Sequence, residues 1–231
     1  SEKKGSLDIK LNGCNRQSVR HFFDLDYDLR PVHEALLQDA PACPAVEAFP
    51  GLRLLNQDSW EAFVCFILSA NNNIQRIKKM RNSLVRYFSP ETPLTFPSFE
   101  LIARSDEPAL RSLGLGYRAP YLLKTCRMLT DSPELIRDLS LIGIEDAVNR
   151  LIQFPGVGPK VADCILLYGF HRLEVFPMDV WMIRVMKSLY FRKRKPNEQK
   201  MRLWALKRWG NLSGYVQQYL FHGVRTGLIQ I

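Results

Sequence analysis

The chain has 231 residues and a net charge of +9, from 32 Lys and Arg against 23 Asp and Glu. With 46% hydrophobic and 24% charged residues, the composition is that of a globular protein, which excludes intrinsic disorder as the main state. The length suits one large domain or two lobes that share a core.

Helical periodicity dominates from residue 60 onward. Apolar residues recur every three or four positions across 60–88, and the polar break at 71–73 indicates two helices there. Further helices are predicted at 97–103, 107–113, 118–129, 144–154, 160–170, 180–191, 198–209 and 214–227. Gly114 and Gly116 end the 107–113 pattern. Only residues 7–11 hint at a strand, so we expect an almost all-α fold.

Neither membrane insertion nor a metal site is indicated. No run of about 18 apolar residues exists, and the first six residues are polar, unlike an apolar signal segment. The five cysteines lie far apart, mostly within apolar runs, as expected of buried thiols in a reducing compartment. Without a Cys-x-x-Cys pair or grouped histidines, zinc or iron–sulfur ligation by side chains is not expected. We expect a soluble, intracellular protein.

Positive charge is concentrated in residues 181–210, which hold ten Lys or Arg and one acid, while the rest of the chain is balanced at 22 against 22. Trp204 and Trp209 are interleaved with this charge. Basic side chains beside aromatic rings suit a polyanion that carries flat bases. Nucleic acid is therefore the leading partner, although a solvated face or a membrane-binding surface would also be basic.

Residues 151–164 contain a turn typical of a ligand-binding hairpin. Pro155 cannot continue the incoming helix, and Gly156 and Gly158 permit a tight turn with close backbone approach to a ligand. Pro159 suits the first turn of the next helix. The free amides at that helix start form an anion site, here suited to a DNA phosphate. Simple packing would also explain such a turn taken alone.

Two ionisable residues follow this turn. Lys160 lies at a helix start, where the macrodipole disfavours a cation, and its ordinary interpretation is a solvent-exposed side chain. Asp179 directly precedes an apolar-periodic helix and is expected to be its N-cap. A capping carboxylate is rigid, which is useful if it must face a developing positive charge.

The run Pro155-Gly156-Val157-Gly158-Pro159-Lys160-Val161-Ala162-Asp163-Cys164, followed by Asp179, resembles the helix-hairpin-helix, Gly/Pro-rich, catalytic-Asp superfamily of DNA glycosylases. More narrowly, the chain is similar to 8-oxoguanine DNA glycosylases of the eukaryotic-type branch. The further matches, which extend the resemblance over roughly residues 20–225, are Phe22-Phe23-Asp24-Leu25-Asp26, Ser69-Ala70-Asn71-Asn72-Asn73-Ile74-Gln75-Arg76, Leu113-Gly114-Leu115-Gly116-Tyr117-Arg118-Ala119 and Gln217-Gln218-Tyr219-Leu220-Phe221.

This resemblance implies a two-lobed enzyme that combines base removal with AP lyase chemistry in a cleft between the lobes. Lys160 would attack C1′ of the sugar, expel the damaged base and form a Schiff base, which requires a neutral amine. Asp179 would stabilise cationic character on the sugar and assist proton transfers. Asp163, three residues from Lys160, is a rival for that role, but the family's catalytic aspartate matches Asp179 and leaves Asp163 structural.

Helical spacing and the resemblance together predict a base pocket. Lys160 and Cys164 are four residues apart, as are Gln217 and Phe221, so each pair shares a helix face. The resemblance implies that Cys164 and Phe221 sandwich the flipped base while Gln217 contacts its Watson–Crick edge. Without the resemblance, Cys164 and Phe221 would be interpreted as ordinary core residues. Trp181 stands where the family often has a histidine, and we expect it near the lesion, near a phosphate or in the core.

The resemblance also assigns residues to the DNA that remains after extrusion. Asn71, Arg76 and Arg118 would contact the orphaned cytosine, and Tyr117 would wedge into the base stack. Without the resemblance, 71–73 would be a turn and Tyr117 a loop aromatic. The predicted phosphate contacts are Gly156, Val157, Gly158, Lys193 and Arg194.

The predicted domain organisation is a tail or remnant of the family's N-terminal β-domain at 1–19, and a helical core at 20–231 whose helix-hairpin-helix lies at about 144–170. Because few residues precede the core, lesion recognition is expected to be less strict than in the family. No cofactor is expected to be required, although hairpin carbonyls would suit a monovalent cation. We expect a monomer, associated with DNA in the cytoplasm, nucleoid or nucleus, that binds duplex DNA containing damaged guanine and no membrane.

Two alternatives stay open. The first is a glycosylase of the same superfamily that removes another damaged base. Lys160 argues against members without lyase activity, and the missing cysteine cluster argues against relatives that carry an iron–sulfur cluster. The second is a non-catalytic helix-hairpin-helix DNA-binding module, which would need the basic face and the hairpin but not Lys160 with Asp179.

Overall fold

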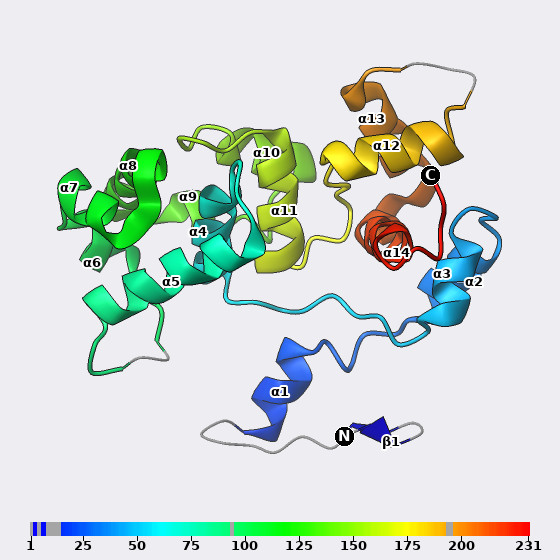
Figure 1. The fold of residues 1–231 in the computed structure, drawn as a ribbon, viewed down its shortest axis with the longest axis horizontal. Coiled ribbons are helices and arrows are strands. Elements are labelled where there is room, and N and C mark those ends of the chain that lie inside the picture. The colour runs from blue at the N-terminus through cyan, green and yellow to red at the C-terminus, as the bar shows by residue number, and fades with distance from the viewer. Residues whose placement is uncertain (1, 4–5, 8–14, 93–94, 193–195) are drawn as a thin grey trace.

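The structure, a computed structural model, describes residues 2–3, 6–7, 15–92, 95–192 and 196–231. It consists of helices in two lobes, with one very short hairpin (Figure 1). The α-helices are α1 Arg16–Phe22, α2 Arg30–Leu37, α3 Cys43–Ala48, α4 Ser59–Ser69, α5 Ile74–Phe88, α6 Phe99–Ala103, α7 Glu107–Leu110, α8 Ala119–Asp131, α9 Glu134–Arg137, α10 Ile144–Leu151, α11 Pro159–Gly169, α12 Val180–Leu189, α13 Glu198–Trp209 and α14 Ser213–Arg225. The short turns are η1 Arg111–Leu115, η2 Gly116–Arg118 and η3 Gly210–Leu212, and the strands are β1 Glu2–Lys3 and β2 Ser6–Leu7.

The predicted, almost all-α architecture is confirmed, and each helix predicted from residue 60 onward is present within a few residues of its expected ends. The sequence analysis did not predict α1, α2, α3 or α9. Proline is found in the first turn of α2 and α3 and immediately before α9, a position that suits proline even though it breaks helix interiors. The strand expected at 7–11 falls mostly outside the described residues; Leu7 belongs to β2.

Helix α4 joins the two lobes because it has three distinct faces. Asp58 caps it by accepting a hydrogen bond from the Glu61 amide at 2.8 Å. Phe63 and Ile67 on one face belong to the larger core, whereas Val64 and Leu68 on another face belong to the smaller core. The third face, made of Cys65, Phe66 and Ser69, lines a cavity between the lobes.

The smaller lobe is built from α4 to α8 and contains its own core. Buried residues from α5, α6, α7 and α8 surround Val64 and Leu68 and exclude water from this face of α4. A hydrogen-bonded ion pair between Arg81 and Glu61, with 2.7 Å between Nε and Oε1, ties α5 to α4. Figure 1 shows this lobe at the left, on the opposite side of α4 and α11 from α12 to α14.

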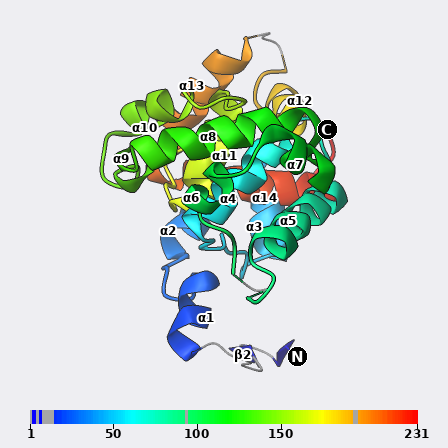
Figure 2. The same ribbon diagram turned by 90° about the vertical axis from the view of Figure 1, so that its left-hand side faces the viewer.

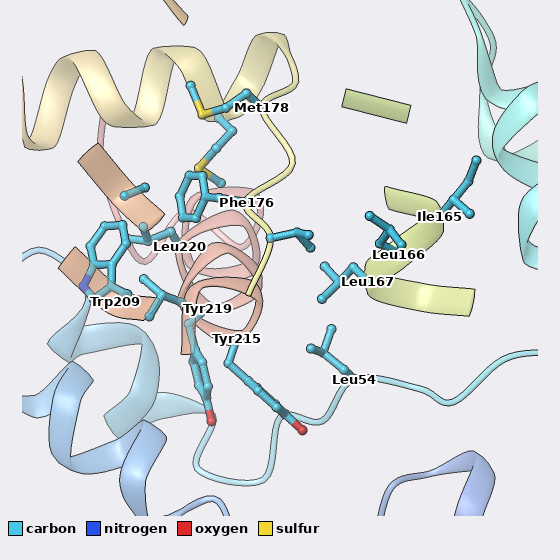
Figure 3. Close-up of a cluster of buried hydrophobic side chains, with 14 of the residues drawn as sticks. Leu54, Ile165, Leu166, Leu167, Phe176, Met178, Trp209, Tyr215, Tyr219 and Leu220 are labelled. Atoms are coloured by element: carbon cyan, nitrogen blue, oxygen red, sulfur yellow. The ribbon is translucent and has the colours of Figure 1, made fainter. Parts of the chain in front are cut away.

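The larger lobe is organised around α14, whose residues Tyr215, Val216, Tyr219 and Leu220 are fully buried. Figure 3 shows Phe176, Met178 and Trp209 packed along this helix. The Tyr215 and Tyr219 hydroxyl groups point away from Phe176 and Met178. The Tyr219 hydroxyl donates to the Phe49 carbonyl at 3.1 Å, so this buried polar group is satisfied.

A buried ion pair ties α13 to α11. Arg202 donates from two nitrogens to the two carboxylate oxygens of Asp163, both at 2.6 Å. The Asp163 side chain is fully buried, and burial raises its pKa, while the hydrogen bonds from Arg202 oppose that rise. Asp163 is therefore already paired and serves the packing of two helices, as expected for a structural role.

The N-terminal segment lies apart from both cores. The paired strands β1 and β2 and helix α1 lie along one edge of the molecule (Figures 1 and 2). Helix α1 contains no buried residue, which explains why its sequence shows no apolar period. Among the described residues, no helix has the combination of length and apolar character needed to cross a membrane.

Replacing Arg202 with methionine should lower the free energy of unfolding by roughly 3–5 kcal/mol, because it leaves the buried Asp163 carboxylate without its partner. Lys200→Met, an exposed change on the same helix, is the control and should have little effect. Thermal or denaturant unfolding of both variants measures the difference. Equal stability of the two variants would contradict the structural role assigned to the Asp163–Arg202 pair.

Candidate active site

A cavity of about 570 Å³ opens between the lobes. Its volume is in the range of small-molecule sites in proteins. It is bordered by α4, α5, α11, α14 and the segment before α12. The lining residues are Gln57, Cys65, Phe66, Ser69, Asn72, Ile74, Ile77, Lys78, Lys160, Cys164, Tyr168, Pro177, Asp179, Gln217, Gln218 and Phe221.

Helix α11 contributes one face to this cavity. Lys160, Cys164 and Tyr168 follow one another at four-residue spacing and all line the wall. Lys160 is half-buried, and its Nζ lies 6.0 Å from the centroid of the Phe66 ring. Burial raises the pKa of the Cys164 thiol to about 12, with the Lys160 charge opposing the rise. The wall therefore presents the Lys160 amine next to a protonated thiol.

Asp179 joins the same cavity from the start of α12. Its carboxylate accepts a hydrogen bond from the Met182 amide at 2.7 Å, so the predicted N-cap is confirmed. The second carboxylate oxygen takes no part in that bond and can face the cavity. Asp163, by contrast, is not among the cavity residues and is committed to Arg202. The structure thus places Lys160 and Asp179 in one cavity that Asp163 does not line.

Helix α14 forms the wall opposite α11. Gln217 and Phe221, four residues apart, both line the cavity, as does Gln218. The Gln217 side chain is nearly buried and donates from Nε2 to the Pro177 carbonyl at 3.3 Å. Gln218 Nε2 donates to Gln217 Oε1 at 2.6 Å. Cys164, Gln217 and Phe221 thus line the same cavity from two helices.

The hairpin between α10 and α11 makes the tight turn that its glycines predicted. Gly156 adopts a φ of +78°, and a Cβ there would lie 2.7 Å from a ring carbon of Tyr121 in α8. Val157 packs into the larger core. Gly158 precedes α11 without a capping side chain, which leaves amides at that helix start available to an anion. Lys193 and Arg194, the other predicted phosphate contacts, lie outside the described residues.

The residues predicted to contact the remaining DNA gather at the ends of α4 and α8. Asn71 is exposed with a φ of +48°, and Arg76 is exposed in the first turn of α5. Tyr117 is 46% exposed and donates from its hydroxyl to the Ala70 carbonyl at 3.0 Å. Arg118 differs, because it is only 2% exposed and donates to the Ala70 and Asn71 carbonyls beneath the Tyr117 ring.

Trp181 lies beside the main cavity. It is 54% exposed and lines a neighbouring cavity of about 440 Å³, which shares Ile74 and Phe221 with the main one. Arg184 lies over its indole, with 5.2 Å between the guanidinium carbon and the ring centroid. Of the environments expected for Trp181, the structure therefore excludes the core.

The sequence analysis missed several cavity residues. The α4 residues Cys65, Phe66 and Ser69 were hidden within an apolar run that reads as core, although a helical projection would have put them on one face. Tyr168 continues the four-residue spacing of Lys160 and Cys164, a signal that was available. Lys78 of α5 is a second lysine at the cavity. Across the residues that the structure covers, no group of His, Cys, Asp and Glu side chains could hold a metal ion.

Two family models match the chain. Residues 64–211 match the HhH-GPD superfamily of base excision DNA repair proteins, and residues 12–63 match the N-terminal domain of 8-oxoguanine DNA glycosylase. The first match begins within α4 and includes the hairpin, Lys160 and Asp179.

Similar proteins cover nearly all of the chain. A probable N-glycosylase/DNA lyase of Methanothermobacter thermautotrophicus is 36% identical, over 93% of this chain and 76% of that protein. The N-glycosylase/DNA lyase of Saccharomyces cerevisiae is 32% identical, over 92% and 69% respectively. The Clostridium acetobutylicum 8-oxoguanine glycosylase/lyase, bound to duplex DNA with cytosine opposite 8-oxoguanine, superposes with a TM-score of 0.84 at 29% identity, over 94% of this chain and 78% of that one. The chain belongs to the HhH-GPD superfamily of base excision DNA repair proteins and, within it, to the 8-oxoguanine glycosylase/lyase family.

Proposed function

We propose that this protein removes 8-oxoguanine opposite cytosine from duplex DNA and then cleaves the strand as an AP lyase. The observation that carries the proposal is the presence of Lys160 and Asp179 in one cavity that also contains Cys164, Gln217 and Phe221. A cavity with a nucleophile, a carboxylate and a base-sized slot is what excision of a flipped base requires.

The chemistry proceeds in two stages. The neutral amine of Lys160 attacks C1′, and the bond from C1′ to the base nitrogen breaks as the base leaves with the electron pair and takes up a proton. Opening of the sugar ring gives a Schiff base between Lys160 and C1′. Loss of a proton from C2′ then drives electrons toward C3′ and expels the 3′ phosphate, and hydrolysis of the imine releases Lys160.

Asp179 acts electrostatically in this scheme. As the base departs, positive charge develops on the sugar, and a fixed carboxylate stabilises it more effectively than mobile water does. The hydrogen bond from the Met182 amide fixes one carboxylate oxygen. The roles of Lys160 and Asp179 therefore differ: one forms the covalent bond, and the other lowers the energy of the charged transition state.

The flipped base is held on three sides. Phe221 of α14 packs on one face of the base and the protonated thiol of Cys164 on the other, while Gln217 bonds the Watson–Crick edge. The raised pKa of Cys164 supports this arrangement, because a thiolate would repel the electron-rich lesion. Trp181, which lines the neighbouring cavity together with Phe221, shields the main cavity or contacts the backbone of the adjacent DNA.

The DNA that remains is held by the opposite rim. Asn71 and Arg76 reach the orphaned cytosine, and Tyr117 fills the gap left in the stack. Arg118 contacts the cytosine after releasing the Ala70 and Asn71 carbonyls that it binds in this structure. Phosphates bind at Gly156, Val157 and Gly158, with Lys193 and Arg194 adding charge. The exposure of Asn71, Arg76 and Tyr117 supports these assignments.

We further propose that carbonyl oxygens of the hairpin bind a monovalent cation. Oxygen ligands suit a hard cation, and neither Gly156 nor Gly158 carries a side chain to crowd it. Bound there, the cation would add positive charge next to the DNA phosphate.

The remaining assignments concern organisation. Residues 1–19 form a tail or a remnant of the family's N-terminal β-domain, and residues 20–231 carry the activity. The enzyme acts as a monomer, and it works where the cell keeps its DNA.

Lys160→Gln should abolish both covalent trapping by borohydride and strand cleavage, because the side chain can no longer form an imine. Lesion binding should persist, since Gln217, Phe221 and the hairpin are unchanged. Lys78→Gln is the matched control: Lys78 is an exposed lysine at the same cavity, and its variant should still be trapped. Trapping that survives in Lys160→Gln would place the nucleophile elsewhere.

Asp179→Asn should slow base removal by roughly 100-fold or more, because it deletes the charge that faces the sugar. Its fold should be intact, since asparagine caps a helix about as well as aspartate. Single-turnover excision of 8-oxoguanine provides the measurement. Asp163→Asn, assayed below its melting temperature, should retain more activity; the reverse order of the two variants would mean that Asp163 is the catalytic carboxylate.

Arg76→Ala and Arg118→Ala should each reduce excision opposite cytosine more than excision opposite adenine, narrowing the ratio of the two rates. The expected change is roughly 10-fold, the size of the discrimination from one arginine–base contact. Arg86→Ala, an exposed change later in α5, should leave the ratio unchanged. An equal loss on both duplexes would reassign the arginine to backbone binding or to support of the turn.

A further inference from the structure

Gln217 has two of its amide hydrogen-bonding positions occupied by protein. Its Nε2 donates to the Pro177 carbonyl at 3.3 Å, and its Oε1 accepts from Gln218 Nε2 at 2.6 Å. A glutamine amide has two N–H donors and two acceptor lone pairs. One donor and one acceptor are therefore left to contact a ligand in the cavity.

The two protein partners fix which end of the amide is nitrogen and which is oxygen. The Pro177 carbonyl can only accept, so it requires Nε2 beside it. A rotation of the amide by 180° would bring Oε1 against that carbonyl and Nε2 against the donor of Gln218. The contact with Pro177 would then be lost, and the contact with Gln218 would survive only if that amide rotated as well, at a site where Gln217 is only 5% exposed and water cannot easily replace them.

Gln218 is itself held in place. It is the residue after Gln217 on α14, and its side chain also lines the cavity. It also acts on the Tyr168 hydroxyl of α11, where it opposes the rise in the pKa of Tyr168 caused by burial. Pro177, Gln217 and Gln218 thus form one hydrogen-bonded chain along the cavity wall, and the Tyr168 hydroxyl lies beside Gln218.

The orientation of the Gln217 amide decides which purine edge fits. Guanine presents an acceptor at its 6-position and a donor at N1, whereas adenine presents a donor at its 6-position and an acceptor at N1. An amide in one orientation pairs with the guanine pattern, and the same amide rotated by 180° pairs with the adenine pattern. A fixed amide selects one base, while a freely rotating one accepts both.

We propose that Gln218 is a positioning residue that locks the Gln217 amide and thereby makes the cavity select a guanine edge over an adenine edge. This inference rests on the proposed function, because it assumes that the flipped base enters this cavity. It concerns the 6-position and N1 of the base, whose donor and acceptor pattern the lesion at C8 leaves unchanged.

The test compares excision of 8-oxoguanine and 8-oxoadenine, two lesions with the same modification but opposite Watson–Crick edges, each placed opposite cytosine in the same duplex. The single-turnover rate constants for the two lesions give an 8-oxoguanine to 8-oxoadenine ratio. Dividing the ratio of a variant by that of the wild type cancels differences in duplex stability. In Gln218→Glu, at about pH 8, the carboxylate can only accept, so it draws Nε2 of Gln217 toward itself and favours the rotated amide.

Gln218→Glu should lower the 8-oxoguanine to 8-oxoadenine ratio by roughly 10- to 100-fold, the discrimination expected from one bidentate base contact. Gln218→Met, which removes the lock without reversing it, should lower the ratio by a smaller factor. Gln38→Glu, an exposed change at the end of α2, should leave it unchanged. Thermal melting checks that each variant is folded.

An unchanged ratio in both Gln218 variants, or equal losses on the two lesions, would overturn the proposal, because a merely structural residue affects both substrates alike. If the wild-type protein excises 8-oxoguanine and the Gln218 variants give this result, only the proposed role of Gln218 is disproved. Wild-type protein that excises neither lesion would disprove the proposed function, and the lock with it.

Discussion

The two-lobed structure depends on α4, because a single lobe cannot bury both of its apolar faces. Phe63 and Ile67 must be buried on one side, and Val64 and Leu68 on another, so two separate cores form against a single helix. The residues between these faces cannot be covered by either lobe without closing the space between them. The cavity is therefore a consequence of packing, and Cys65, Phe66 and Ser69 line it because they occupy the remaining face.

The helices from residue 60 onward could be predicted because their apolar periodicity reflects burial against one of these cores. Helices α2 and α3 could not, since their prolines signal a break, whereas the structure uses them in first turns. The same logic holds at the site. The four-residue spacing places Lys160 with Cys164, and Gln217 with Phe221, on shared helix faces. Spacing does not predict that α11 and α14 line the same cavity. It also does not exclude Asp163 as the catalytic carboxylate, whereas the ion pair with Arg202 assigns Asp163 a structural role.

Burial distinguishes residues whose roles look equivalent in the sequence. Arg76 and Arg118 read equally as candidates for DNA contact, yet one is exposed and the other is held under a turn by backbone carbonyls. Two aspartates near Lys160 differ in the same way, one as a helix cap at a cavity and one in a buried ion pair. Such differences arise from contacts between segments far apart in the chain, which local patterns do not contain.

Tyr121 contacts two separate segments that are proposed to bind DNA, the hairpin and the turn that carries Tyr117. Its ring packs under Gly156 in the hairpin and meets the ring of Tyr117 edge-on, with centroids 6.2 Å apart. The hairpin belongs to the larger lobe, and both tyrosines belong to the smaller one. In the proposed complex the hairpin would hold a phosphate while Tyr117 would enter the base stack, and the contacts of Tyr121 with both would fix the distance between these two positions. The number of nucleotides between the held phosphate and the extruded base is then set by the protein, whatever the sequence of the DNA.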